Sequence, residues 1–419
     1  MKKLFLGCLG FALILCVTSS VRAENETTAK CDSACNPCEE LSCEPCEPCI
    51  FDGCGPKTSR WIYGSHLEAG IYINEYGQKN EYGPGGLNGN YGNTDILQNV
   101  RQSDFQMNQL YFYFGRQLDT RRGWDFGGRV DFMFGTDARV VQSQGLETAA
   151  GHGTWNSGDY YTALPQLYFE AGYKKFNVKI GKFVVPMGHD SVLSTDRFFY
   201  SLSDAFSALP KTQTGVLVNY DFNKKFSAFG AWTCGTGTML EGGDSFFDSS
   251  DNNAFLGGIN YAYNKRLTFG YSVMLGKDDR WNWDRDYFIQ SFIVGYKPGK
   301  RWDYTFEWTL RNEKTDNGVH AHWGAYGINN ELTYRLSRNW SLGARAEWLH
   351  YYSGGFDDDK INVTFGANWT PTKWLTVRPE IRYDRFDKSR PFNWAQTDRG
   401  TGHDKKDQLA GGISAVLSY

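Results

Sequence analysis

Apolar and polar side chains alternate along much of the chain after residue 60. The clearest stretch is 302–311, where the two kinds exchange at every position: Trp302, Asp303, Tyr304, Thr305, Phe306, Glu307, Trp308, Thr309, Leu310 and Arg311. The same period of two recurs in 124–133, 340–347 and 375–384. Successive side chains of a β-strand point to opposite faces of the sheet, so this period predicts strands with one apolar and one polar face.

Sixteen stretches are predicted as strands: 61–73, 107–116, 124–137, 163–173, 176–183, 212–220, 226–234, 254–263, 267–275, 288–296, 302–311, 326–336, 340–350, 361–369, 375–384 and 409–419. Most are close to the roughly 9–11 residues with which a tilted strand crosses a bilayer, and bacterial single-chain barrels have an even number of strands. We therefore predict an all-β fold, a transmembrane antiparallel β-barrel of about 16 strands over 61–419.

The connections between these strands alternate in length. Eight are long, at 74–106, 138–162, 184–211, 235–253, 276–287, 312–325, 351–360 and 385–408. Seven are short, at 117–123, 174–175, 221–225, 264–266, 297–301, 337–339 and 370–374. Outer-membrane barrels have short periplasmic turns and long extracellular loops, so the alternation supports this topology and predicts an outer-membrane location.

Aromatic residues make up 16% of the chain, and their positions are more informative than their number. Many stand beside a predicted short turn, as do Trp124, Trp302, Trp340 and Trp374. A soluble sheet would concentrate its rings in mid-strand, whereas a ring at the strand end is typical of the girdle at a membrane interface. The chain ends on Tyr419, the form of the C-terminal signal that the barrel-assembly machinery recognises. Lipid and that machinery are therefore expected partners.

The N-terminal part differs from the rest in composition. Residues 1–23 read as a secretory signal peptide, with Lys2 and Lys3 before an apolar stretch and Val21-Arg22-Ala23 before a cut. Residues 24–60 form a Cys/Pro/Glu-rich tail, expected on the periplasmic side because it precedes the first strand. The net charge is −3, so nothing points to a nucleic acid partner.

Seven cysteines lie in the tail: Cys31, Cys35, Cys38, Cys43, Cys46, Cys49 and Cys54. The oxidising compartment beyond the inner membrane favours disulfides, and an odd number predicts at least one bond or thiol outside the set. Bonds to other envelope proteins are one interpretation. Zinc binding through the two-residue spacings and the absence of a specific role are the alternatives.

Four stretches resemble the OmpL-like family of β-barrel porins. They read Met-Asn-Gln-Leu-Tyr-Phe-Tyr-Phe at 107–114, Gly-Arg-Val-Asp-Phe-Met-Phe-Gly-Thr-Asp-Ala at 128–138, Val-Lys-Ile-Gly-Lys-Phe-Val-Val-Pro-Met-Gly at 178–188 and Thr-Gly-Val at 214–216. The resemblance covers 61–419 and implies a porin rather than an enzyme, with a homotrimer as the expected assembly. The Cys-rich tail is not covered by it.

Charged residues of both signs occupy the polar faces of the strands. The basic ones of interest are Arg129, Arg311, Arg335, Arg345, Arg378 and Arg382, and the acidic ones are Glu307, Glu347 and Glu380. A charge facing lipid at mid-depth costs a few kcal/mol, so these side chains are expected to line the lumen. They either solvate the wall and pair across strands, or they set a selectivity field.

The connection 184–211 is the candidate constriction. It is the third long loop, the one that narrows the pore in porins, and it carries Asp190, Asp196, Arg197 and Asp204. If it folds inward, its carboxylates oppose the arginines of the later strands and produce a transverse field. A surface lid is the alternative.

The sequence shows no nucleophile elbow, Walker loop or His-Glu-x-x-His motif, so no catalytic site, cofactor or metal site is predicted. A barrel enzyme is accordingly the weakest alternative, and a gated importer needs a plug domain and 22 strands. We expect passive diffusion of small hydrophilic solutes or ions through the barrel. A structural barrel crosslinked through its tail is the alternative, and both roles can coexist.

Overall fold

The computed structural model describes residues 60–76, 103–149, 152–153, 155–158, 160–235, 246, 253–278, 285–316, 320–397 and 400–419. The predicted signal peptide, the tail up to residue 59 and its seven cysteines lie outside the described residues. None of the described helices is long and apolar enough to cross a membrane.

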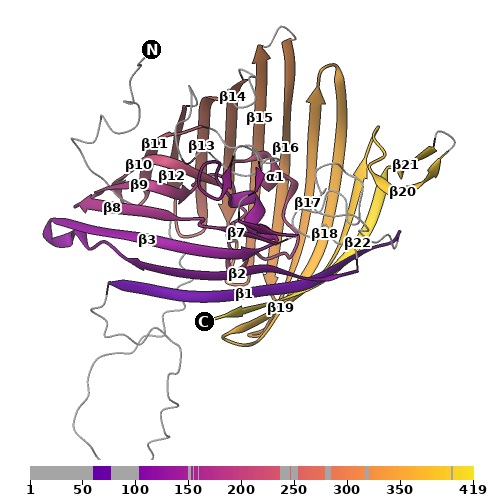
Figure 1. Cartoon of the computed structure of the whole chain (residues 1–419). Coiled ribbons are helices and arrows are strands. Elements are labelled where there is room, and N and C mark those ends of the chain that lie inside the picture. Colours follow the sequence, from indigo (N-terminus) through magenta and orange to yellow (C-terminus); the bar gives the residue numbers. More distant parts are fainter. Residues whose placement is uncertain are drawn as a thin grey trace, which may run out of the picture.

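Sixteen antiparallel strands of the described chain close into a barrel, which confirms the predicted fold class (Figure 1). They are β1 (Trp61–Asn74), β2 (Phe105–Arg116), β3 (Trp124–Gly135), β8 (Leu167–Tyr173), β9 (Phe176–Val184), β10 (Thr212–Asn223), β11 (Phe226–Thr233), β12 (Ala254–Ala262), β13 (Leu267–Asp278), β14 (Arg285–Tyr296), β15 (Trp302–Asp316), β16 (His320–Arg335), β17 (Trp340–Ser353), β18 (Phe356–Thr372), β19 (Leu375–Phe386) and β22 (Asp407–Ser418). Every predicted strand overlaps one of them.

Shorter elements lie in the connections. The strands among them are β4 (Thr148–Ala149), β5 (His152–Gly153), β6 (Asn156–Ser157), β7 (Tyr160–Ala163), β20 (Phe392–Thr397) and β21 (Gly400–Lys405). The helices are η1 (Thr120–Arg122), η2 (Asp137–Val141), η3 (Ser194–Asp196) and α1 (Asp204–Ala208).

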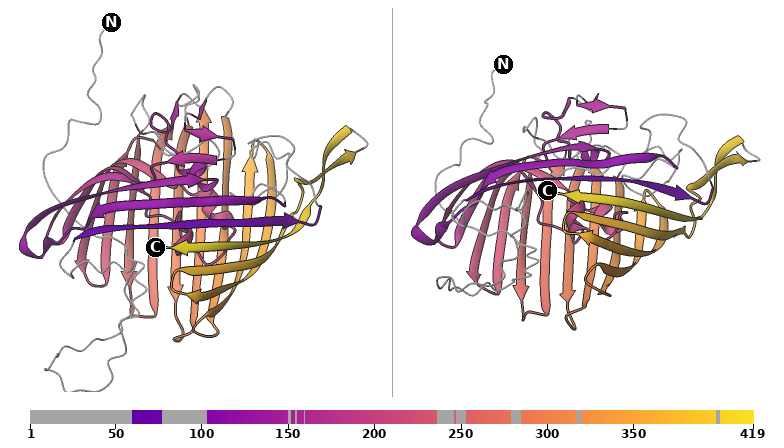
Figure 2. Two further views of the ribbon diagram at one scale, coloured as in Figure 1. Left: turned by 60° about the horizontal axis from the view of Figure 1, so that its bottom comes forward. Right: turned by 90° about the horizontal axis from the view of Figure 1, so that it is seen from below.

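The first and last barrel strands close the ring. β1 pairs with β22 from His66 opposite Ser418 to Asn74 opposite Ala410. The amide of Tyr419 donates to the Ser65 carbonyl at 2.8 Å and the Ser65 amide donates back at 3.1 Å, so the last residue belongs to the seam. Both views of Figure 2 show the C-terminal strand lying beside β1. Because the strand number is even, both ends of the barrel sequence lie at one end of the barrel, which we call the short-turn end.

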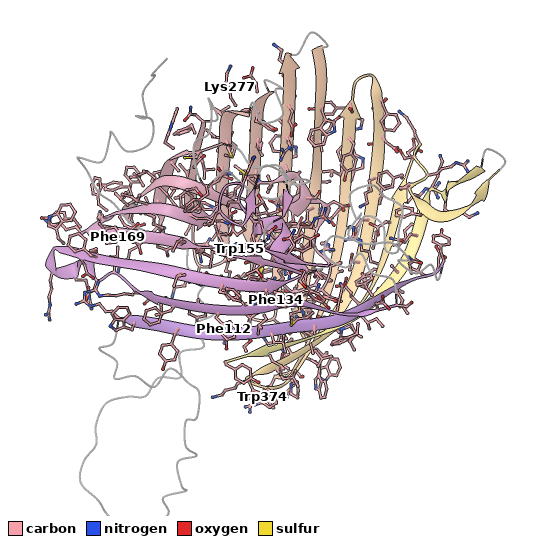
Figure 3. All side chains as sticks on the ribbon, viewed as in Figure 1. Phe112, Phe134, Trp155, Phe169, Lys277 and Trp374 are labelled. Atoms are coloured by element: carbon pink, nitrogen blue, oxygen red, sulfur yellow. The ribbon has the colours of Figure 1, made fainter. Side chains whose placement is uncertain are left out.

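Burial along the strands is opposite to that of a soluble protein. In β18, Lys360, Asn362 and Thr364 face inward and are at most 1% exposed, whereas Ile361 and Phe365 face outward and are 49% and 58% exposed. Exposed rings also mark the strand ends, and Figure 3 shows Trp374 at the turn between β18 and β19. An apolar outer face over a polar interior is the pattern of a barrel whose solvent is lipid.

One predicted strand is interrupted. β3 pairs with both β7 and β8, which together occupy the place of the predicted strand 163–173. Pro165 lies in the gap and has no backbone N–H to donate to the ladder. The Asp131 amide still donates to the Gln166 carbonyl at 2.8 Å, so the wall remains closed there.

The prediction of long loops at 312–325 and 351–360 is wrong. Strands β15 and β16 remain paired up to Asp316 opposite His320, so most of 312–325 is strand. Strands β17 and β18 remain paired up to Ser353 opposite Phe356, around Gly354 and Gly355, both of which have positive φ. Two residues with positive φ form a tight hairpin turn that continues the strands, so 351–360 is a hairpin (Figure 1).

Candidate functional site in the barrel interior

The connection 185–211, which we call the lumen loop, lies inside the ring of strands. It carries η3 and α1, and all five residues of α1 are buried. Its two ends pack in an apolar cluster on the wall, through Val185, Met187 and Leu209 against Leu256 and Ile289. Figure 1 shows α1 within the barrel, in front of β15 and β16.

The second long connection also enters the interior. Ala138 and Val141 of η2 pack with Val192, Leu202 and Phe206 of the lumen loop in a second apolar cluster. Further along this connection, the Lys182 ammonium of β9 lies 2.8 Å from the Glu147 carboxylate, and both side chains are fully buried. The sequence pattern did not indicate that this connection folds inward.

Glu380 of β19 binds the middle of the lumen loop. Its carboxylate accepts hydrogen bonds from the amides of Tyr200 and Ser201, at 2.7 and 3.0 Å, and from the Tyr72 hydroxyl at 2.8 Å. All three donors are at most 2% exposed. Glu380 thus joins the loop to two strands of the wall.

The start of α1 is held by charges from three strands. Glu347 accepts from the amides of Asp204 and Ala205 at 2.7 and 3.3 Å. The Asp204 carboxylate lies 2.8 Å from the Lys360 ammonium and 3.1 Å from the Arg382 guanidinium. Burial raises the pKa of Asp204, but the two cations outweigh it and hold that pKa at about 2.

Three wall arginines donate to carbonyl groups of the loop. Arg345 binds the Ser201 and Leu202 carbonyls at 2.9 and 3.2 Å, and its guanidinium lies 4.9 Å from the centre of the Phe199 ring. Arg382 also binds the Leu202 carbonyl, at 2.8 Å. Arg378 binds the carbonyls of residues 194 and 197, at 2.9 and 3.1 Å. The loop backbone is therefore pinned to β17 and β19.

The loop also extends a cation toward β1 and η2, on the other side of the seam strand β22 from β19. The Arg197 guanidinium lies 3.1 Å from the carboxylates of Glu68 on β1 and Asp137 on η2. Glu68 also pairs with Arg378 of β19, so the four charges form a chain that joins η2, the lumen loop, β1 and β19. Burial lowers the pKa of Arg197, yet the two carboxylates raise it overall, so the guanidinium stays charged.

His189 and Asp190 begin the loop beside β16. The His189 ring lies 3.8 Å from the Glu331 carboxylate. Burial lowers its pKa, but Glu331, Asp190 and Glu307 together raise it to about 9. Asp190 accepts from the Ser203 amide at 2.9 Å; burial raises its pKa, and Arg345 and His189 lower it overall.

His189, Asp190 and Glu331 place three ligand atoms within 4.8 Å of one another, the spacing at which a metal ion can bridge them. The charge of Arg345 beside Asp190 opposes a cation there, and the histidine already pairs with Glu331. We therefore interpret the cluster as an anchor of the loop.

The remaining predicted residues are less directly tied to the loop. Arg311 pairs with Glu313 at 2.5 Å and reaches the Ala208 carbonyl only at 3.4 Å, while Glu307 accepts from the Ser291 hydroxyl at 2.8 Å and the His189 amide at 3.2 Å. Arg129 pairs with Asp131 at 2.6 Å on the same strand. Asp196 is exposed, and Arg335 is exposed at the short-turn end.

The structure therefore does not gather the three loop carboxylates into one acidic face opposite the arginines. Asp204 touches Lys360 and Arg382 directly, Asp190 binds the loop backbone, and Asp196 is exposed and accepts from the Ser191 hydroxyl at 3.5 Å. Sequence reasoning missed Lys360, because it lay in a predicted loop, and it missed Asp137. The period-two alignment of Lys360 with Asn362 and Thr364 was the available signal.

At the short-turn end, a cavity of about 510 Å³ separates the lumen loop from the turn 297–301 and from the ends of β16 to β19 and β22. Its charged lining consists of Arg197, Lys297, Lys300, Arg301, Arg335, Arg378 and Asp303. We call this cavity the basic vestibule.

Comparisons with known proteins agree with this architecture. Residues 66–419 match the family described as "Putative beta-barrel porin-2, OmpL-like". No curated protein matches the chain. Among solved structures, the chain is similar to OmpT, an outer membrane protein of Vibrio cholerae in its trimer form, with 12% identity, a TM-score of 0.55 and coverage of 86% of this chain and 99% of that chain. It is also similar to the anion-selective porin from Comamonas acidovorans, with 9% identity, a TM-score of 0.58 and coverage of 86% and 99%. At these identities the likeness shows the shared barrel fold alone.

Proposed function

Because the chain belongs to the OmpL-like β-barrel porin family through residues 66–419, we propose that it is an outer-membrane porin through which small hydrophilic solutes or ions diffuse passively. The observation that carries the proposal is the polar interior of a closed barrel. Residues such as Asn362 and Thr364 face the lumen, and the basic vestibule opens between the wall and the lumen loop. A barrel with an outward apolar face and a polar interior is the architecture of a diffusion channel.

Conductance across a planar lipid bilayer tests the proposal. Purified full-length protein should produce uniform current steps, and the same preparation should show heat-modifiable mobility on a gel as evidence that the barrel is folded. Folded protein that inserts into the bilayer without current steps contradicts the porin function and leaves the structural-barrel alternative.

We further propose that the lumen loop narrows the channel, with Asp190, Arg197 and Asp204 at its wall contacts. Removing residues 190–205 should raise the single-channel conductance, because it removes η3 and the start of α1 from the cross-section. A matched control replaces the β20–β21 hairpin, which pairs only with itself and is not part of the barrel sheet. Equal conductance in the loop deletion and the control contradicts the constriction.

Assembly and surroundings complete the proposal. The barrel is expected to be a homotrimer inserted by the barrel-assembly machinery, with periplasmic short turns and extracellular long loops. It acts as a channel rather than as an enzyme, and no cofactor is needed for diffusion. The tail precedes β1, so in this topology it lies on the periplasmic side together with the short turns. Its seven cysteines favour an additional role in crosslinking the barrel to other envelope proteins there.

A further inference from the structure

The charged lining of the basic vestibule is strongly asymmetric. Among the residues that the structure describes, six cationic side chains and the single carboxylate of Asp303 face this cavity. The remaining lining is mostly hydroxyl and amide groups, including Thr333, Ser341 and Asn368. All of these groups except the carboxylate can donate hydrogen bonds to an anion.

Three of the six cations are already neutralised by carboxylates. Lys297 pairs with Asp303 at 2.6 Å, and Arg197 and Arg378 share Glu68. Arg197 also pairs with Asp137, so the inner part of the vestibule is close to electrically balanced. The positive field of the cavity must therefore come from the other three cations.

Lys300, Arg301 and Arg335 are the cations without a carboxylate partner. All three are exposed, and within the described parts of the chain no acidic side chain forms an ion pair with any of them. Two lie on the turn 297–301 and the third ends β16, so they stand together at the mouth of the cavity. Solute that passes through the short-turn end meets three uncompensated positive charges.

We propose that the basic vestibule makes the channel selective for small anions, with Lys300, Arg301 and Arg335 as the selectivity-determining residues. This inference rests on the proposed porin function. A cleft lined by one sign of charge concentrates counter-ions and repels ions of the same sign. Guanidinium groups also match the geometry of carboxylate and phosphate oxygens, so small carboxylates and oxyanions are the favoured solutes.

The size of the cavity agrees with this class of solute. A volume of 510 Å³ is many times the roughly 10–15 Å³ that one water needs, so an ion of a few heavy atoms fits together with part of its hydration shell. The three cations are solvent-exposed, so salt screens them over about 8 Å at physiological ionic strength. The selectivity should therefore weaken as the salt concentration rises.

Reversal potentials in a planar bilayer test the proposal. With a potassium chloride gradient across the full-length wild-type protein, we expect chloride to permeate at least about threefold more readily than potassium, with the ratio rising at lower salt. The triple substitution Lys300→Gln, Arg301→Gln and Arg335→Gln should bring the ratio close to one. Because these side chains are exposed and form no ion pairs with the described residues, the barrel should still fold, and heat-modifiable mobility checks that it does.

The matched control removes three positive charges elsewhere at the short-turn end. Lys224, Lys265 and Arg266 are exposed on the turns before β11 and β13 and do not line the vestibule, so their substitution by Gln should keep the anion preference.

A second measurement uses an oxyanion as the permeating ion. Sodium phosphate on one side of the bilayer should carry a measurable anion current in the wild type and a smaller one in the vestibule variant.

The outcomes separate the two proposals. Current steps without anion preference, or an anion preference that the vestibule variant retains, overturn the selectivity assignment and leave the porin function intact. Equal loss in the vestibule variant and the control variant also overturns it, since general surface charge then explains the preference. Folded protein without any current overturns the porin function and the selectivity together.

Discussion

Glu380 is the residue whose removal should release the lumen loop most specifically. Its carboxylate accepts two backbone amides of the loop, from Tyr200 and Ser201, and the hydroxyl of Tyr72. A hydrogen bond to a charged group contributes about 1.5–3 kcal/mol. The substitution Glu380→Ala should therefore lower the free energy of local opening at each amide by about that amount.

This free energy corresponds to a defined change in hydrogen exchange. A loss of about 1.5–3 kcal/mol reduces the protection of an amide roughly 10- to 150-fold. Exchange measured by mass spectrometry on detergent-solubilised protein should show this change in peptides that contain 199–202. Peptides from β17 and β18 should keep their protection, because Arg345 and the Asp204 ion pairs still hold the neighbouring parts of the loop.

Two control variants define the interpretation. Glu380→Gln keeps an acceptor oxygen but loses the charge, so its effect should be smaller than that of the alanine variant. Asp131→Asn removes another buried wall carboxylate, one whose partners are Tyr111, Arg129 and Gln166 rather than the lumen loop. Unchanged exchange at 199–202 in Glu380→Ala, or an equal rise throughout the barrel, refutes the anchoring role.

Three further predictions concern pH, assembly and the tail. The pKa of His189 is raised to about 9 from 6.5, so its charged form stabilises the anchored loop fully below pH 6.5, and this stabilisation is lost as pH rises through about 9. Hydrogen exchange of the loop amides should therefore accelerate between pH 8 and 10 relative to the His189→Gln variant at the same pH. Equal exchange in the two proteins contradicts the anchoring role of His189. Deleting Tyr419 removes two backbone hydrogen bonds of the β1–β22 seam and should reduce the heat-modifiable, inserted fraction; complete insertion of the shortened chain argues against an assembly signal. If the tail cysteines form disulfides to other envelope proteins, non-reducing gels of isolated envelopes should show a ladder of bands that reductant collapses. A monomer whose seven tail thiols all react with alkylating reagent excludes disulfides. Zinc release on alkylation indicates a metal site instead.

The strands could be predicted because lipid imposes their pattern residue by residue. Ile361 and Phe365 must be apolar where they face the bilayer, and the residues between them are free to be polar. Above the membrane this constraint ends. The run Asp357, Asp358 and Asp359 breaks the alternation, yet these residues continue the ladder of β17 and β18, and the prediction therefore stopped too early.

The candidate site could be predicted only in part. The inward placement of Arg345, Arg378 and Arg382 follows from the same alternation, and their burial agrees with it. Their partners could not be predicted, since Leu202 and Arg382 are 180 residues apart and neither sequence pattern specifies the other. Local periodicity fixes which way a side chain points but not which distant segment fills the space in front of it.

The mixed charge of the barrel wall follows from the polar backbone of the lumen loop. A loop inside a barrel leaves few of its N–H and C=O groups to solvent, and unpaired buried groups are costly. The wall pairs the N–H groups of the loop with carboxylates and its C=O groups with guanidinium groups. Carboxylates accept the amides at 189, 200, 201, 204 and 205, and guanidinium groups donate to the carbonyls at 194, 197, 201, 202 and 208.

Most of the wall charge is thus committed to holding the loop and contributes little net field to a passing solute. A cation that touches a loop carbonyl and a carboxylate at once, such as Arg378 or Arg382, is largely neutralised where it stands. Removing it should disturb the loop before it alters ion preference. Selectivity then has to arise from cations that the loop does not use, and Lys300, Arg301 and Arg335 meet that condition because they lie at the cavity mouth without carboxylate partners among the described residues.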